Sequence, residues 1–144
     1  MEKRFEKTPN LPSAFIRSCK KRKGGSKAAD STGIDLSGSS LLTRCLVLRR
    51  LLRRHVLDDE EEHVGVLLPP SIGGLAANLA LSLDRRIAVN LNYTVSSDVL
   101  NACIELCGIQ HVLTSRKFME KMAFDLDAEL VYLEDLRDDP AKAA

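Results

Sequence analysis

The stretch HVGVLLPPSIGGLAANLALSLDRRIAVNLNYTVSSDVLNACIELCGIQHVLTSR, residues 63–116, decides the fold of this 144-residue chain. Short runs of Val, Ile and Leu alternate in it with longer segments whose apolar residues recur every three or four positions. Runs of the first kind are typical of buried strands, and segments of the second kind are typical of helices packed on a sheet. Strand, helix, strand, helix, strand is the βαβ pattern, which implies parallel strands joined by crossover helices. The stretch therefore predicts an α/β fold with a parallel sheet flanked by helices.

Proline, serine and glycine residues in this stretch mark where its strands and helices begin and end. Pro69 and Pro70 end the first strand, because proline has no N–H to donate to a strand ladder. Ser71 and Ser96 are expected to cap the two helices, and Gly108 to end the second one. The expected strands cover residues 63–68, 86–91 and 110–114, and the expected helices cover residues 71–83 and 96–107.

Further elements are predicted on both sides. Upstream, a short helix over 11–23 stops at two glycines, and two short strands at 27–32 and 34–36 form a hairpin. A longer helix follows, capped by Ser37 or Ser39, with an apolar stripe that runs from Leu41 to Leu52. Downstream, we expect a helix over 115–122, a strand over 130–133 and a polar tail that frays.

Composition bounds the domain organisation. The chain is 44% hydrophobic and only 4% aromatic, so a core of Leu, Val, Ile and Ala is expected. Its length fits one ordinary domain. We divide it into a basic lead-in with a short helix (1–26), an α/β domain (27–137) and a flexible tail (138–144).

Charge is unevenly distributed although the net charge is only +1. Residues 1–27 hold nine basic residues against two acidic ones, and residues 120–139 hold eight acidic residues against two basic ones. The basic run 49–54 could bind nucleic acid or an anionic membrane surface, but we favour the interpretation that it is the solvated face of a helix. The acidic run from Asp58 to Glu62 is expected to be a solvated turn that offsets these arginines, in preference to a cation site.

The cysteines and histidines show no ligand spacing. Cys19, Cys45, Cys103 and Cys107 form no CxxC motif, and the three histidines (His55, His63, His111) are scattered. We therefore expect reduced, mostly buried thiols and no metal site.

Membrane and export signals are not expected either. Residues 64–83 are uncharged over the length of a membrane-spanning helix, but two prolines and two glycines interrupt them, which favours strand, turn and helix. The charged N-terminus lacks the apolar core of a secretory signal, so we expect a cytoplasmic protein.

The segment Ser71-Ile72-Gly73-Gly74 is the candidate phosphate loop, because it follows a strand and opens a helix. It matches neither GxGxxG nor GxxxxGK[ST], so we favour a simple helix start. GxSxG and HExxH are absent as well. Asn92 and Tyr93, just beyond a strand, are the polar pair nearest to where α/β ligand sites form, although loop capping is the favoured role. No catalytic, cofactor-binding or metal-binding residue is predicted.

The residues from His63 to Arg116 resemble the early part of adenylate-forming enzymes, the superfamily of acyl-CoA synthetases, luciferases and peptide synthetases. The matching features are Val64–Pro70, Ser71–Leu83, Ile87–Asn92, Ser96–Cys107, Gly108 and His111–Ser115. Upstream, DLSGSSLLTRCLVLRRLL (35–52) resembles the family's first well-formed helix, and downstream AELVYLEDLR (128–137) resembles the strand before its catalytic region. Within the superfamily, the sequence most resembles the acyl-acyl-carrier-protein synthetase branch, which includes bifunctional 2-acylglycerophosphoethanolamine acyltransferases.

This resemblance covers about residues 10–137 and implies an incomplete N-terminal lobe. The family's phosphate loop, its Tyr-Gly-x-Thr-Glu segment, its ribose-binding Asp and its catalytic lysine have no counterpart in this sequence. The leading hypothesis is a truncated or split part of a fatty-acid-activating ligase, with no catalysis of its own. ATP and Mg²⁺ are implied for a complete family member, and no cofactor for this chain alone.

Two alternatives remain open. One is a non-catalytic interaction module, which would dock against the remainder of a split ligase or self-associate through an exposed sheet edge. The other is a basic protein that binds nucleic acid or a membrane surface.

Overall fold

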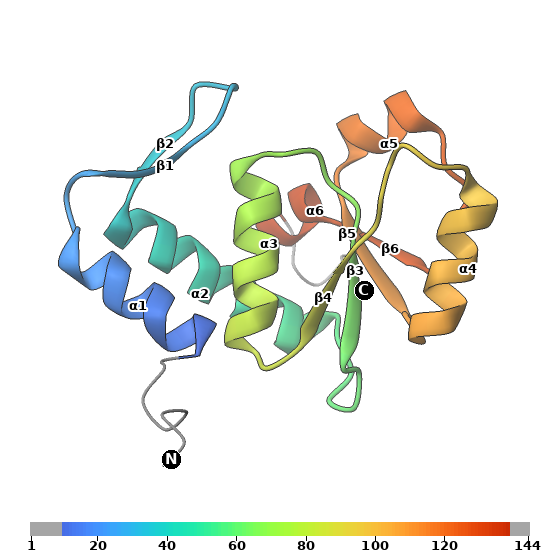
Figure 1. Cartoon of the computed structure of the whole chain (residues 1–144), viewed down its shortest axis with the longest axis horizontal. Coiled ribbons are helices and arrows are strands. Elements are labelled where there is room, and N and C mark those ends of the chain that lie inside the picture. The colour runs from blue at the N-terminus through green and yellow to red at the C-terminus, as the bar shows by residue number, and fades with distance from the viewer. Residues whose placement is uncertain (1–9, 139–144) are drawn as a thin grey trace, which may run out of the picture.

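The computed structural model describes residues 10–138 (Figure 1). Its helices are α1 (Leu11–Lys21), α2 (Gly38–His55), α3 (Ile72–Leu83), α4 (Ser97–Cys107), α5 (Arg116–Met122) and α6 (Leu133–Asp138). Its strands are β1 (Ser26–Ala29), β2 (Asp35–Ser37), β3 (His63–Val66), β4 (Ile87–Asn90), β5 (His111–Thr114) and β6 (Glu129–Tyr132). The predicted lead-in at 1–9 and the end of the predicted tail at 139–144 lie outside the described residues.

Two sheets are present in this part of the chain. β1 and β2 form the predicted antiparallel hairpin. β3 to β6 form a parallel sheet in the order β4-β3-β5-β6. The predicted α/β class and the parallel βαβ sheet are therefore confirmed.

The predicted start and stop signals are mostly confirmed. The Ser37 and Ser71 hydroxyls cap α2 and α3 by accepting backbone N–H bonds from Ser40 and Gly74. Gly108 ends α4 with a φ of 63°, in the left-handed region that glycine tolerates. Ser96 occupies the predicted N-cap position of α4, but its side chain makes no capping hydrogen bond.

Helices cover both faces of the parallel sheet (Figure 1). On one face, α2, α3 and α6 bury Leu52, Leu81 and Leu136 against Val64 and Val131. On the other face, α4 and α5 pack Leu100, Ile104 and Met119 against Leu67 and Val112. Because successive strand residues point to opposite faces, the continuous apolar runs in the sequence serve both layers.

Helix α1 is integrated into the fold through a third cluster. Phe15 and Cys19 of α1 pack with Leu41 and Cys45 of α2. The two helices approach so closely that a Cβ added at Gly38 would collide with the α1 backbone, 2.6 Å from the Cys19 carbonyl oxygen. The domain boundary at residue 26 stays a prediction.

The helix after β6 was not predicted. Residues 133–138 form α6, in which Leu136 is buried, and the predicted flexible tail (138–144) lies almost wholly outside the described residues. Glu134 and Asp135 lie in its first turn, where negative charge is favourable. Among residues 10–138, no helix combines the length and the apolarity needed to cross a bilayer.

Candidate functional site

The carboxyl ends of β3 and β4 border a cavity of about 380 Å³. In parallel α/β sheets, ligands bind outside this edge. The lining is more apolar than polar, and comprises Val66, Leu68, Pro69, Pro70, Ser71, Gly74, Leu75, Asn78, Asn90, Leu91 and Tyr93. The structure thus brings Ser71 of the candidate phosphate loop and Tyr93, the candidate ligand-site residue, to the same cavity.

Backbone N–H groups at the start of α3 already have acceptors from the chain. Asp30, from the loop between β1 and β2, accepts a hydrogen bond from the Ile72 N–H through Oδ2 at 2.9 Å. Ser71 Oγ accepts from the Gly74 N–H at 3.1 Å. The Ile72 hydrogen bond lowers the pKa of Asp30 below its ordinary value. A carboxylate of the chain therefore occupies the position where a phosphate would sit, which supports a simple helix start.

Asn92 and Tyr93 have different roles. Asn92 Oδ1 accepts from the Thr94 N–H at 3.0 Å and from the Thr94 hydroxyl at 2.7 Å, so Asn92 shapes the loop as expected. Tyr93 packs edge to face on Phe118, with 5.4 Å between the ring centroids. Of the two, Tyr93 lines the cavity.

A reciprocal amide pair in the same cavity was missed by the sequence analysis. Asn78 of α3 donates to Asn90 Oδ1 at 3.0 Å, and Asn90 at the end of β4 donates to Asn78 Oδ1 at 2.7 Å. Asn78 also donates to the Gly74 carbonyl. In the sequence, Asn78 stands out as a polar residue within an apolar helix, and that signal could have found it.

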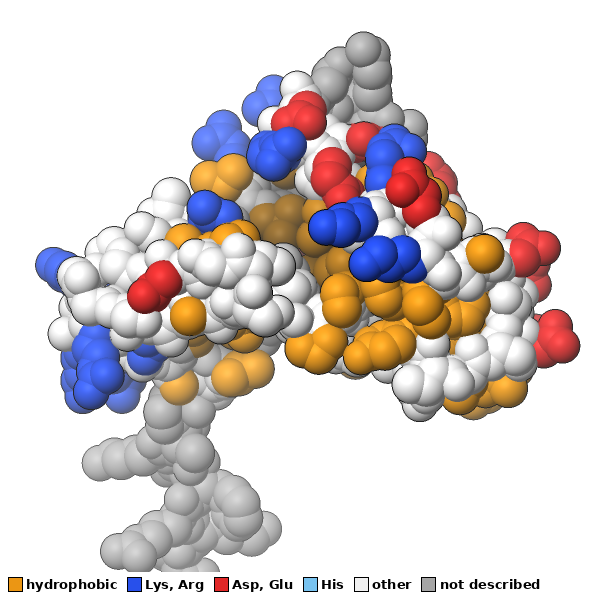
Figure 2. All heavy atoms as spheres, turned by 90° about the horizontal axis from the view of Figure 1, so that it is seen from above, with side chains coloured by type: hydrophobic (Ala, Val, Ile, Leu, Met, Phe, Trp, Pro, Cys, Tyr) orange, Lys and Arg blue, Asp and Glu red, His pale blue; other side chains and the backbone are white. Residues whose placement is uncertain are grey.

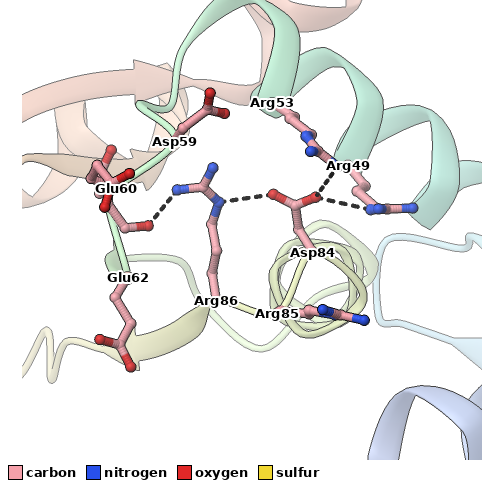
Figure 3. A pocket seen from close by; sticks show the side chains of 9 residues that line it. Arg49, Arg53, Asp59, Glu60, Glu62, Asp84, Arg85 and Arg86 are labelled. Atoms are coloured by element: carbon pink, nitrogen blue, oxygen red, sulfur yellow. Dashed lines mark hydrogen bonds and ion pairs between the residues drawn. The ribbon is translucent and has the colours of Figure 1, made fainter.

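The amino end of the sheet holds a second cavity, of about 520 Å³, lined almost entirely by charged side chains (Figure 3). Asp84, nearly buried, accepts from Arg49 Nε at 3.0 Å and from Arg86 Nε at 2.8 Å, and Arg53 Nη1 lies 3.9 Å away. Arg86 also donates to the Asp58 and Glu61 carbonyls. This cluster joins the end of α2, the start of β4 and the loop before β3.

The cluster corrects one expectation about charge. The acidic run from Asp58 to Glu62 was expected to offset the arginines of α2, but Asp84 is the carboxylate that pairs with Arg49 and Arg53. Arg50 and Arg54 are exposed, as a solvated helix face requires. The three acidic residues at 58–60 are exposed as well.

Glu61 corrects the expectation of a wholly solvated acidic turn. Its side chain is 1% exposed and lies against His111 at the start of β5. Glu61 Oε1 accepts from the His111 N–H at 3.1 Å, and Oε2 lies 2.8 Å from His111 Nδ1. The hydrogen bond with Glu61 raises the pKa of His111, against the effect of its burial. His111 Nε2 lies 3.4 Å from Glu129 on the opposite side.

No family model matches the sequence. The NpsA N-terminal subdomain from Klebsiella oxytoca, in complex with 3-hydroxybenzoyl-AMSN, has a TM-score of 0.76 at 12% identity, over 90% of this chain and 31% of that one. O-succinylbenzoate coenzyme A synthetase (MenE) from Bacillus subtilis, in complex with AMP, has a TM-score of 0.74 at 16% identity, over 95% of this chain and 34% of that one. The nonribosomal peptide synthetase FmoA3, in its α-methyl-L-serine-AMP bound form, has a TM-score of 0.73 at 16% identity, over 93% of this chain and 15% of that one.

This is the fold of the N-terminal subdomain of adenylate-forming enzymes. At identities of 12 to 16% the likeness is one of fold. The chain spans about a third of the NpsA and MenE chains that it matches. The expected architecture is thus confirmed, and the chemistry of the adenylate-forming enzymes stays a proposal for this chain.

The four cysteines are free thiols. Cys19 and Cys45 are buried, as expected, and burial raises the pKa of Cys45 to about 11. Cys103 is exposed and Cys107 is half-buried, so the expectation of burial holds for only half of the thiols. No group of three or more metal-ligating side chains occurs within residues 10–138.

Proposed function

We propose that this chain supplies the first α/β lobe of an ATP-dependent ligase that activates a carboxylic acid as its adenylate. The observation that carries the proposal is the fold match, which extends over about nine-tenths of the chain. Matched structures include MenE with ATP and magnesium and FmoA3 with an aminoacyl-AMP. In this lobe the sheet and its helices act as a scaffold.

We expect no catalysis by these 144 residues alone. Activation of an acid by ATP requires groups that stabilise charge on the phosphates during transfer. The sequence matches neither GxGxxG nor GxxxxGK[ST], and Asp30 occupies the anion position at α3. The residues that hold the triphosphate must therefore come from another part of the complete enzyme.

A fatty acid is the substrate class we propose, within the acyl-acyl-carrier-protein synthetase branch. The support is the sequence resemblance of residues 63–116, from which the leaning toward this branch comes. Under this proposal the lobe docks with the remainder of the ligase.

The test is to assay the chain alone and joined to the downstream reading frame, using ATP–pyrophosphate exchange with fatty acids. Exchange that needs the joined polypeptide and a fatty acid supports the proposal. Exchange by the 144-residue chain alone refutes the scaffold role, and a joined polypeptide that activates no carboxylic acid refutes the ligase.

A second candidate is an interaction module, favoured by the sheet edges at β4 and β6, which pair with no further strand within residues 10–138. Ile87 on β4 is 45% exposed, and an exposed strand edge can pair with another chain. Light scattering after size exclusion distinguishes this candidate, because a monomer at all concentrations argues against self-association through an edge.

A further inference from the structure

Helix α4 carries apolar side chains on its buried face and also on part of its exposed face. Leu100 and Ile104 point inward and are almost fully buried. On the outer face, Val99 is 48% exposed and Leu106 is 87% exposed, the largest value for a large apolar side chain among the described residues. Large apolar side chains that gather on an exposed face are a feature of interaction surfaces.

The exposed apolar residues of α4 form one stripe. Val99, Ala102, Cys103 and Leu106 are spaced by three, four and seven positions and are exposed. Side chains at this spacing share one face of a helix. The stripe from Val99 to Leu106 extends over about 10 Å along the axis, enough for two turns of a partner helix.

A groove of about 690 Å³ runs beside this stripe. Asp98, Ala102 and Glu105 of α4 line one side of it, and Asp127 lines the other. The far wall is fixed to α4, because Asn101 donates to the Asp125 carbonyl at 3.1 Å and accepts from the Asp127 N–H at 2.9 Å. The groove is therefore a built feature of the fold.

The charged side chains that line the groove are all acidic. The chain has no Lys or Arg between Arg86 and Arg116. Within residues 10–138, Asp98, Glu105 and Asp127 make none of the ion pairs found. Figure 2 shows acidic and apolar side chains at the α4 end of the molecule, while basic side chains lie at the α1 and α2 end and, mixed with acidic ones, nearer the centre.

We propose that this face of α4 and its groove bind a basic amphipathic helix of a partner protein. Leucine-like side chains of that helix would cover Val99 and Leu106, and Lys or Arg on its flank would face Asp98, Glu105 and Asp127. A second copy docked through the same face is disfavoured, because each carboxylate would then face like charge in the groove. The inference goes beyond the proposed ligase function and does not require it.

The test uses the full chain and a fluorescent helical peptide of about 15 residues, with Leu at positions i, i+3, i+4 and i+7 and Lys at the flanks. We expect saturable binding that weakens as salt rises from about 0.05 to 0.5 M. Leu106→Ser should raise the dissociation constant about tenfold or more, because it removes a large apolar contact. Circular dichroism should stay unchanged, since this side chain is exposed.

Matched controls make the result decisive. Leu11→Ser removes an exposed leucine on α1, 64% exposed, and should leave the affinity unchanged. A peptide with Glu in place of Lys, and a scrambled peptide, should bind at least tenfold more weakly. Equal affinities for the Leu106→Ser and Leu11→Ser variants, or equal binding of the acidic peptide, would overturn the proposal. Self-association of the wild type that Leu106→Ser abolishes would overturn it too, because the occupant would then be a second copy.

Discussion

Replacing Glu61 by Ala would leave the two His111 donors, the backbone N–H and the ring Nδ1–H, buried without an acceptor. Each hydrogen bond to a charged group contributes about 1.5–3 kcal/mol, and removal of one partner of a buried ion pair costs about 3–5 kcal/mol. Both groups are nearly buried, so we expect a loss of about 3–5 kcal/mol in the free energy of unfolding near pH 6. Urea unfolding followed by circular dichroism measures this loss. The slope of the free energy of unfolding against urea concentration should stay unchanged.

The same pair predicts a dependence on pH with a definite sign. The folded-state pKa of His111 is raised above its unfolded value, so the stabilisation is complete below about pH 6.5. It is lost as the pH rises through the folded-state pKa. The wild type should therefore lose stability between about pH 6 and pH 9 relative to Glu61→Gln, which carries no negative charge to stabilise the imidazolium.

Neighbouring acidic residues provide controls for this pair. Glu60 and Glu62 are exposed, and their replacement by Ala should change the free energy of unfolding by no more than about 0.5 kcal/mol. The reasoning is refuted by a Glu61→Ala cost below about 1 kcal/mol, or by a gap between wild type and Glu61→Gln that is the same at both pH values.

Three further changes test other contacts. Gly38→Ala should destabilise the fold by at least about 2 kcal/mol in urea, because its Cβ meets the α1 backbone, although alanine favours a helix by about 1 kcal/mol. Asp84→Asn should cost about 3 kcal/mol by the same assay, since the buried guanidinium of Arg86 loses its carboxylate. Asp30→Asn should speed hydrogen exchange at the Ile72 amide above about pH 4, where the wild-type carboxylate is charged. In the wild type, protection of this amide from exchange should disappear as the pH falls through the lowered pKa of Asp30.

These three changes have internal comparisons. A Cβ added at Gly24 would meet nothing within 4 Å, so Gly24→Ala should be close to neutral. Asp59→Asn, at an exposed acid on the same cavity as Asp84, should cost little. Thr32→Val removes the hydroxyl that bonds to the same Asp30 oxygen as the Thr32 N–H, and should leave the Ile72 amide protected. A destabilising Gly24→Ala, or unchanged exchange in Asp30→Asn, would contradict the corresponding explanation.

The strands, and their alternation with helices along the chain, were predictable because the local sequence signals agree with the burial of these segments. Val64 to Leu68 is almost continuously apolar, two prolines follow it, and Ser71 then caps a helix. The strand ends at Val66 rather than Leu68, although the Leu67 N–H still bonds to the Leu113 carbonyl. Boundaries of this kind depend on ladder geometry, which composition does not report.

The candidate sites were less predictable, because their members are far apart in the sequence. Asn78 and Asn90 meet across an α3–β4 connection, and Glu61 meets His111 across two crossovers. Asp84 joins arginines of α2 over a similar separation. Residue type gives no indication of such pairs until the strand order is known. The helix α6 was missed because its polar sequence hides the single buried contact of Leu136.

The strand order also has a consequence for synthesis on the ribosome. β3 pairs with β4 on one side, but its other neighbour, β5, comes more than forty residues later in the chain. A nascent chain can thus complete one flank of β3 while the opposite flank still exposes unsatisfied backbone groups, an opportunity for wrong intermolecular pairing. The interval closes once residues 111–114 have emerged, so slow translation between β4 and β5 should raise the yield of aggregate.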